Sequence, residues 1–310
     1  MRDNSPPDIA PESSGADNSI RLATFDQYRG LLFSIAYRML GSVSDAEDML
    51  QETYLRWQTS FDDEIRSPRS YLVTILSRLC INHLQSARVQ REEYVGVWLP
   101  EPIVTDSSNP FNLIKIDESL SMAFLIILER LTAIERAVFL LKEVFEYEYR
   151  EVATILGHTE ANCRQILKRA KEHVAAMQPR FRPAQPDRDA LLESFLKATG
   201  TGEMKDLLKL LTDDVVLRSD GGGKGVAVPS EVYGVDKVAR GVLGGLKRLV
   251  PSGLIRKLAH INGEPGVINY LDGEPHSVLT IAVRDGRISS IYVITNPDKL
   301  RHLPSIASPL

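Results

Sequence analysis

The chain has few of the features that mark a secreted, membrane-spanning or metal-binding protein. Its 310 residues include only two cysteines, Cys80 and Cys163, which lie far apart and without the spacing of metal ligands. A disulfide framework or a zinc site is therefore not expected. No run of about 18 or more apolar residues occurs, so no membrane span is expected. The polar, acidic N-terminus lacks the regions of a signal peptide. We expect a cytoplasmic protein without cofactor or metal.

The net charge of −4 argues against a protein that coats nucleic acid, but the charge is unevenly distributed. Residues 1–63 hold eleven acidic residues against five basic ones, whereas residues 159–182 hold six basic residues against two acidic ones. This asymmetry predicts a protein partner for the N-terminal part and a phosphate-bearing partner for the basic segment.

Apolar residues recur at three- and four-residue steps from Phe25 to about Val174, which predicts a largely helical region. The first helix should end at Gly41. Ser44, with Glu47 three residues later, forms a capping box for the next helix. A long helix over 68–91 follows, because its proline suits a first helical turn.

Breaks in this pattern divide the chain into domains. Residues 1–20 are expected to be a disordered leader, and residues 21–93 a helical domain. Three prolines and a Ser-Ser-Asn cluster make residues 94–115 an extended linker. A second helical domain should span 116–180, with helices running from near Ile116 through Leu131 to Val144. Its last part, 149–174, has the pattern of a helix-turn-helix.

The pattern changes after the prolines between 179 and 186. Residues 187–310 predict an α+β domain with two helices, 189–199 and 204–211, and an antiparallel, strongly curved sheet. The Asp-Gly pairs at 272–273 and 285–286 are hairpin signals. The expected strands are 214–218, 255–261, 266–270, 277–284 and 288–295.

The segment 159–174 has the charge pattern of a DNA-recognition helix. Its apolar residues, from Cys163 to Val174, share one face, and the other face carries side chains that can meet base edges and phosphates. The helix N-terminus can also bind a phosphate. The predicted contacts are Thr159, the N-cap, with Glu160, Arg164, Gln165, Lys168 and Arg169. A solvated amphipathic helix has the same pattern, so this segment alone leaves both interpretations open.

The long helix 68–91 carries basic and polar residues along its outer surface, with Tyr71 and Tyr94 nearby. Charge and stacking together could hold single-stranded DNA. The predicted contacts are Arg69, Arg78, Asn82, His83 and Arg88. An ordinary solvent-exposed helix surface remains the alternative.

An acidic cluster follows the first predicted helix. It contains Asp45, Glu47, Asp48, Gln51 and Glu52. Acidic residues in the first turn favour the positive end of the helix dipole. That accounts for the first three residues but less well for Gln51 and Glu52.

The order of these segments resembles the extracytoplasmic-function (ECF) RNA polymerase sigma factors. Residues 28–57, with the core D-A-E-D-x-x-Q-E, resemble region 2, and 67–92 resemble the part that reads and melts the −10 element around a flipped base. Residues 131–174 resemble region 4, which reads the −35 element. The resemblance implies that the acidic cluster binds the β′ coiled coil of RNA polymerase core and that the β flap and promoter DNA are further partners.

Three further motifs resemble the sigma-J type, the subgroup with a fused C-terminal SnoaL-like domain of the NTF2/cystatin-like fold. In that subgroup the domain regulates the sigma part and replaces a separate anti-sigma protein. The resemblance implies contact between these motifs. They are Trp98-Leu99-Pro100-Glu101-Pro102, Asp220-Gly221-Gly222-Gly223-Lys224 and Asn296-Pro297-Asp298-Lys299-Leu300.

Two other functions remain as alternatives. A helix-turn-helix regulator could bind duplex DNA without polymerase, with an unidentified small molecule in the C-terminal pocket. A SnoaL-type enzyme would need an acid/base in a dry pocket. The candidates are Asp220, His260, Asp272 and His276. Turn positions account better for Asp220 and Asp272, so no enzyme activity is expected. The glycine run lacks the spacing of a Walker loop and predicts a tight turn close to another backbone.

Overall fold

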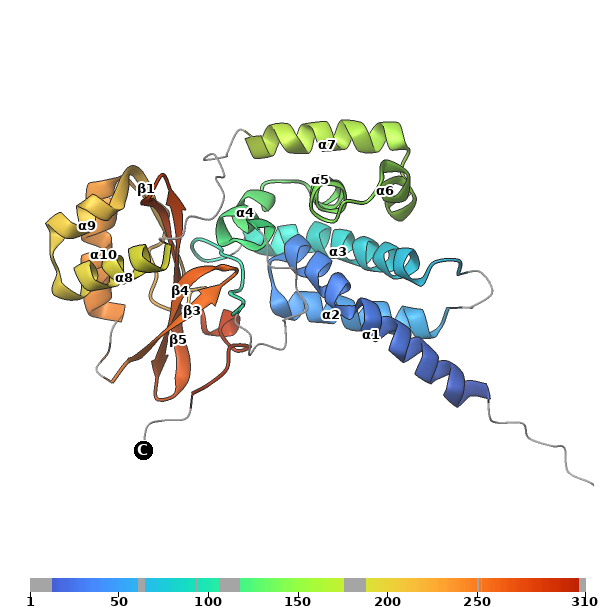
Figure 1. Cartoon of the computed structure of the whole chain (residues 1–310), viewed down its shortest axis with the longest axis horizontal. Coiled ribbons are helices and arrows are strands. Elements are labelled where there is room, and N and C mark those ends of the chain that lie inside the picture. Colours follow the sequence, from blue (N-terminus) through green and yellow to red (C-terminus); the bar gives the residue numbers. More distant parts are fainter. Residues whose placement is uncertain are drawn as a thin grey trace, which may run out of the picture.

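A helical part joined to an α+β part makes up the computed structural model of the chain (Figure 1). The structure describes residues 13–60, 65–92, 94–105, 118–175, 188–249, 251 and 253–306. Among these residues, no helix combines the length and the hydropathy that crossing a bilayer requires.

Three helices form the first helical unit: α1 (Ser13–Leu40), α2 (Val43–Gln58) and α3 (Pro68–Glu92). The predicted leader is wrong for residues 13–20, which belong to α1; residues 1–12 lie outside the described part. The Arg21 guanidinium donates to the Trp57 carbonyl at 2.6 Å. This contact holds the first part of α1 against the end of α2. A helix that is already formed extends readily towards residue 13, because each further residue adds one backbone hydrogen bond.

The turn between α1 and α2 corrects one predicted cap. Gly41 ends α1 in the left-handed region, at φ 69°, as the sequence predicts. The N-cap of α2 is Ser42 rather than Ser44, because its hydroxyl accepts a 3.1 Å hydrogen bond from the Asp45 amide. The helix therefore starts directly after the glycine and leaves the Ser44 side chain for another contact.

The second helical unit consists of several short helical segments, where the sequence predicts helices from near Ile116 through Leu131 to Val144. Thr132 and Glu135 form a capping box that starts a new helix after α4, since they satisfy the free amides reciprocally. The helix-turn-helix is confirmed, with Gly157 at φ 70° between its helices. The segments are η2 (Glu118–Leu120), α4 (Met122–Leu128), α5 (Ala133–Phe139), a π-helical turn η3 (Leu140–Val144), α6 (Tyr149–Leu156) and α7 (Glu160–Ala175).

The two helical units share one hydrophobic core. Buried residues of α3, such as Leu72 and Leu76, belong to the same apolar cluster as Val138 of α5 and Val152 of α6. Figure 1 shows α3 between the α1–α2 pair and the α5–α6 pair, with α7 on the outer side of α5 and α6. The two units are thus packed together rather than held apart.

The C-terminal domain contains a six-stranded sheet in the order β2-β1-β6-β5-β4-β3. Strands β1 and β6 are parallel, so the prediction of a purely antiparallel sheet is wrong. Parallel neighbours need a long crossover, and the chain between β1 and β6 supplies it. The elements are α8 (Arg188–Thr201), α9 (Met204–Leu210), β1 (Leu211–Asp220), β2 (Val232–Tyr233), α10 (Val235–Leu249), β3 (Ile255–Ile261), β4 (Glu264–Leu271), β5 (Glu274–Arg284), β6 (Arg287–Ile294) and η4 (Pro297–Lys299).

Both faces of this sheet are covered. Successive strand residues point to opposite faces, so Val267 packs with helices α8–α10 while Ile268 packs with the linker residue Leu99 and with Met122 of α4. The helices lie on the side of the sheet away from the helical units (Figure 1). The other face therefore rests on the interdomain linker and on the second helical unit.

Candidate functional site

The acidic cluster lies on the outer face of α2. Glu47, Asp48 and Gln51 are exposed. Asp45 and Glu52 are half-buried and have partners: Asp45 lies 3.5 Å from the His83 ring, and Glu52 lies 2.8 Å from Arg56. The buried face of α2, which includes Leu50 and Trp57, packs into the core. The cluster is therefore a presented surface, with three of its five side chains facing solvent.

The predicted contacts on α3 differ in their surroundings. Arg78 and Asn82 are exposed. Arg69 is also exposed, and its guanidinium lies 4.9 Å from the ring centre of Tyr147, which follows η3. His83 contacts the acidic cluster, and the Arg88 side chain lies outside the described residues. Two of the predicted nucleic-acid contacts, Arg69 and His83, thus have partners within the protein.

The predicted recognition surface on α7 is open. Arg164, Gln165, Lys168 and Arg169 are exposed, opposite the buried residues Cys163 and Ala170. A helix with one packed face can present the other to a groove.

The start of α7 has the expected cap. The Thr159 hydroxyl accepts a 3.2 Å hydrogen bond from the Asn162 amide. Glu160 lies 2.8 Å from Arg164, and the Arg164 guanidinium lies 4.8 Å from the Tyr149 ring centre. These contacts orient one arginine of the recognition surface.

The three subgroup motifs meet at Asp220, which is fully buried at the end of β1. Its carboxylate accepts hydrogen bonds from the Leu99 amide at 2.8 Å and the Tyr94 hydroxyl at 2.5 Å. It also lies 2.7 Å from the ammonium of Lys299, which donates to the Leu99 carbonyl as well. Burial, and next the hydrogen bond to Asp220, raises the pKa of Tyr94 above its ordinary range. Linker, glycine loop and C-terminal turn therefore share one buried ion pair.

The glycine loop approaches the C-terminal turn closely. A Cβ on Gly222 would lie 2.2 Å from the side-chain amide nitrogen of Asn296, and one on Gly225 would lie 2.3 Å from the backbone carbonyl oxygen of Thr295. Gly222 also has φ 56°. The predicted close approach of this loop to another backbone is therefore observed. At its rim, Lys224 lies 2.5 Å from Asp298.

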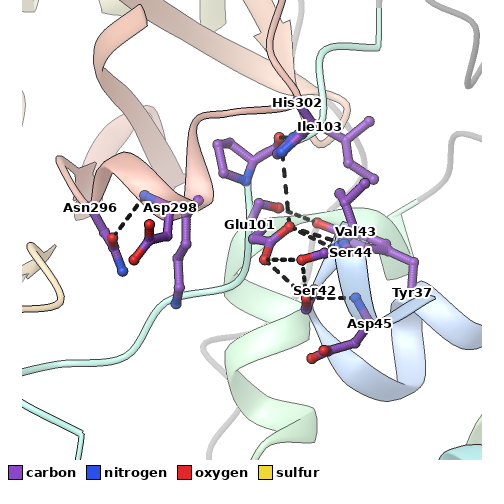
Figure 2. Close-up of polar contacts among 12 residues, drawn as sticks. Tyr37, Ser42, Val43, Ser44, Asp45, Glu101, Ile103, Asn296, Asp298 and His302 are labelled. Carbon is purple, nitrogen blue, oxygen red and sulfur yellow. Dashed lines mark hydrogen bonds and ion pairs between the residues drawn. The ribbon is translucent and has the colours of Figure 1, made fainter. Parts of the chain in front are cut away.

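Glu101 links the linker to the start of α2 (Figure 2). Its carboxylate accepts hydrogen bonds from the Val43 amide at 2.8 Å and the Ser42 hydroxyl at 2.9 Å. A carboxylate at a helix N-terminus satisfies free amides and the helix dipole together. On the other side, His302 contacts the carbonyl of Pro102 at 2.6 Å. The linker is thus held between α2 and the C-terminal end of the domain.

Asn262 is a contact residue that the sequence analysis missed. It occupies the tip of the β3–β4 hairpin at φ 54° and is almost fully buried. Its side chain donates to the Tyr37 hydroxyl at 2.6 Å and to the Leu120 carbonyl at 3.1 Å, and it accepts from the Ile103 amide at 3.0 Å. The Asn-Gly pair at 262–263 is the same kind of hairpin signal as the two Asp-Gly pairs and could have located the turn.

The four acid/base candidates have separate surroundings. Asp220 belongs to the buried ion pair described above. His260 lies 3.7 Å from Asp189 and is half-exposed. Asp272 is exposed at a hairpin tip at φ 52°, and His276 is half-buried near the start of β5.

Comparisons with known proteins agree with the resemblance. The family model Sigma-70 region 2 matches residues 24–89, and Sigma-70, region 4 matches residues 121–174. The chain is 38% identical over 299 residues to the ECF RNA polymerase sigma factor SigJ of Mycobacterium tuberculosis, covering 92% of this chain and 95% of the relative. The chain belongs to the ECF RNA polymerase sigma factors.

Two further similarities extend over most of the sigma factor. It is 29% identical over 282 residues to the probable ECF sigma factor SigI of M. tuberculosis, covering 90% of this chain and 94% of the relative. The crystal structure of M. tuberculosis SigJ matches with a TM-score of 0.75 and 34% identity, covering 90% of this chain and 97% of that one. The match therefore includes the C-terminal domain.

The sigma factor directs promoter-specific transcription initiation, and its partners are RNA polymerase core and promoter DNA. The first helical unit carries region 2, and the second carries region 4. The interdomain contacts at Asp220, Glu101 and Asn262 therefore connect a fused domain to the linker, to region 2 and, at Leu120, to the start of the helical unit that carries region 4.

Proposed function

We propose that the C-terminal domain holds regions 2 and 4 of this sigma factor in a closed arrangement and thereby limits promoter binding. Within this proposal, the exposed acidic surface of α2 binds the β′ coiled coil of polymerase core. Helix α3 reads the −10 element, α7 reads the −35 element, and region 4 contacts the β flap. We expect the protein to act in the cytoplasm, with the polymerase.

The observation that supports closure is the direct packing of region 2 on region 4. The positions −10 and −35 differ by about 25 base pairs, or roughly 85 Å of duplex at about 3.4 Å per pair. Arg69 of α3, however, stacks on Tyr147 of region 4 at 4.9 Å. The buried Arg136 of α5 donates to the Met39 carbonyl of α1 at 2.5 Å. Helices in such contact cannot reach both elements, so the two regions must separate.

The C-terminal domain supports the closed arrangement through the linker. Lys299 and Asp220 hold the linker at Leu99, Asn262 holds it at Ile103, and Glu101 in turn holds the start of α2. If the two regions are to move apart on the polymerase, the linker must break at least some of these contacts. We infer that the domain acts by contact and not by catalysis, because Asp220 is used in the ion pair.

An effector can open this arrangement only if it binds the open form more tightly than the closed form. Polymerase core and promoter DNA satisfy that condition within the proposal, since they bind regions 2 and 4 at a wide separation. A domain that stabilises the closed form reduces the fraction of molecules that are open, and the apparent affinity for core and promoter falls in proportion to that fraction.

The proposal is tested by measuring the distance between α3 and α7. Gln85 and Glu172 are exposed, so Gln85→Cys and Glu172→Cys accept spin labels or fluorophores, while the native Cys80 and Cys163 are buried. We expect a single short distance in the free protein and a much longer one with polymerase core and a promoter fragment. The same protein should initiate RNA synthesis in vitro. An unchanged distance in a transcribing complex would overturn the closed arrangement as an inhibitory state.

A further inference from the structure

The ammonium group of Lys299 lies in an aromatic cage. It is 4.1 Å from the ring centre of Trp98 and 5.2 Å from that of Tyr94. It also lies 2.7 Å from an Asp220 oxygen and donates to the Leu99 carbonyl. A cation between aromatic faces and a carboxylate is the arrangement by which proteins recognise alkylammonium groups.

The cage is built from residues that are held independently of Lys299. One oxygen of Asp220 accepts from the Tyr94 hydroxyl at 2.5 Å and the Gly222 amide at 3.1 Å, and the other accepts from the Leu99 amide at 2.8 Å. Asn296 donates to the Tyr94 hydroxyl at 2.9 Å. The carboxylate and one ring therefore keep several partners when the lysine is absent.

The carboxylate also needs a cation. Asp220 is fully buried, and the Lys299 side chain beside it is 8% exposed. A buried charge whose partner is removed is strongly unfavourable, because neither water nor a counter-ion compensates it. If Lys299 moves out, the cage becomes a preformed site with an uncompensated negative charge.

We propose that Tyr94, Trp98 and Asp220 form a binding site for a small organic ammonium cation, and that Lys299 occupies this site in cis in the closed arrangement. The site deepens the proposed autoregulation and rests on it for its effect on transcription. A free alkylammonium compound can enter only when the C-terminal turn has withdrawn its lysine. Such a ligand binds the released form alone and therefore favours it.

Trp98 connects the site to region 2. A Cβ on Gly41 would lie 2.7 Å from the Trp98 ring, so this ring touches the α1–α2 turn while its face covers the cation. Glu101, three residues further along the linker, accepts from the Val43 amide at the start of α2. Exchange of the lysine for a free cation would thus release the C-terminal turn next to the helix that carries the acidic surface.

The attached lysine has an advantage over free amines. A group delivered by its own chain acts at an effective concentration in the millimolar range or above. Weak monoamines should therefore leave the wild-type protein unchanged at concentrations that fill an emptied cage. This difference allows the site and its occupant to be tested separately.

The test uses the full-length variant Lys299→Ala. The substitution removes three carbons and the ammonium nitrogen from the side chain, which n-propylammonium can replace. The variant is titrated with n-propylammonium chloride at constant ionic strength. We expect the substitution to lower the melting midpoint by about 5 °C or more, as for a broken buried ion pair. n-Propylammonium should restore most of that loss, increasingly with concentration, and should raise the midpoint more than n-propanol does. Wild type should show no ammonium-specific rise.

Two variants control for nonspecific effects. Lys224→Ala removes another lysine of the same motifs, one that is 59% exposed and paired with Asp298, and should show no response to n-propylammonium. Adding Asp220→Asn to Lys299→Ala should abolish the response by removing the negative charge. If Lys299→Ala is too unstable to purify, Lys299→Ser empties the cage and keeps a group that water can hydrate.

Transcription separates the two proposals. If Lys299→Ala increases transcription but binds n-propylammonium no better than n-propanol, the ammonium site is overturned and autoregulation stands. If n-propylammonium stabilises the variant while transcription equals that of wild type, the site stands and autoregulation through this contact fails.

Discussion

Asn262 and Tyr37 are 225 positions apart in the sequence, and the Asn262 amide donates a 2.6 Å hydrogen bond to the Tyr37 hydroxyl. That hydroxyl in turn donates to the Glu101 carbonyl at 2.6 Å. A hairpin tip of the C-terminal domain, a helix of region 2 and the linker are therefore joined through consecutive buried hydrogen bonds. The contact suggests where substitutions should loosen the closed arrangement without touching the surfaces proposed to bind polymerase or DNA.

Asn262→Gly should shift the protein towards the open arrangement. Glycine keeps the positive φ that this hairpin position needs, so the substitution removes the side-chain hydrogen bonds with little backbone strain. Leaving the buried Tyr37 hydroxyl and Leu120 carbonyl short of a donor should weaken the contact by about 1–3 kcal/mol. The α3–α7 label distance should show a larger open fraction, and transcription with limiting core should rise.

Asp272→Gly is the matched control. Asp272 also occupies a hairpin tip at positive φ, but it is exposed. Its substitution should leave the distance distribution as in wild type. Equal effects of the two substitutions would mean that Asn262 acts through hairpin stability and not through the interdomain contact.

Glu101→Gln should loosen the linker from α2. The side chain keeps its shape but loses the charge that accepts from the Val43 amide and faces the helix dipole. A hydrogen bond to a charged group contributes about 1.5–3 kcal/mol, and the dipole adds about 0.3–1 kcal/mol. Hydrogen exchange of the Val43 and Ser44 amides should become faster. Glu172→Gln, on an exposed part of α7, should leave these amides as protected as in wild type.

Asp48→Lys should prevent association with polymerase core, because it reverses an exposed charge at the centre of the acidic surface. We expect at least a tenfold loss in a pull-down or in polarisation binding, which corresponds to about 1.4 kcal/mol or more. Glu193→Lys makes the same charge change on α8 of the C-terminal domain and should bind core normally. Normal binding by Asp48→Lys would show that the docking surface lies elsewhere.

Arg164→Ala and Lys168→Ala should weaken binding to the −35 element. A lost phosphate contact should reduce the slope of log affinity against log salt by about 1, whereas a lost base contact should cost about 1–3 kcal/mol at one base pair. Footprinting and binding at several salt concentrations distinguish the two cases. Arg240→Ala, which removes an exposed arginine of α10, should leave the −35 footprint intact.

Alkaline pH should destabilise the folded protein above the ordinary tyrosine pKa. Burial raises the pKa of Tyr292 to about 12, and it raises the pKa of Tyr37 further. Below about pH 10 these groups are protonated in both folded and unfolded chains, so they cause no pH dependence. Above it the unfolded chain loses protons first, and stability falls as pH rises.

Ultraviolet absorbance of phenolate, followed during an alkaline titration, should show these tyrosines ionising late, together with unfolding. Tyr292→Phe should reduce the late phase and make the unfolding midpoint less dependent on pH. A late phase of unchanged amplitude in Tyr292→Phe would contradict the assignment.

The sequence alone determined the local features of the helical regions. The start of α3 at Pro68, the end of α1 at Gly41 and the turn of the helix-turn-helix at Gly157 were all predictable. Periodicity also assigned the buried and exposed faces of α7. Each of these depends on residues within a few positions of one another, which is the range over which propensity, capping and helical period act.

Prediction failed where local signals competed with one another or were weak. Ser42 and Ser44 are both acceptable caps, and the position of Gly41 decided between them. Helix α10 was missed because three glycines weaken its local signal. The sequence predicted helices across residues 116–144 without placing the capping box of Thr132 and Glu135, which starts α5.

The tertiary structure alone decided how the parts meet. The sequence grouped Asp220, Lys299 and Leu99 only through a family resemblance, and it contained no sign that Asn262 would reach Tyr37 or that Glu101 would cap α2. Residues 58 to 225 positions apart are brought together by burial of apolar surface, which has no direction along the chain. Hydrogen bonds and the ion pair then select the one arrangement in which the buried polar groups find partners.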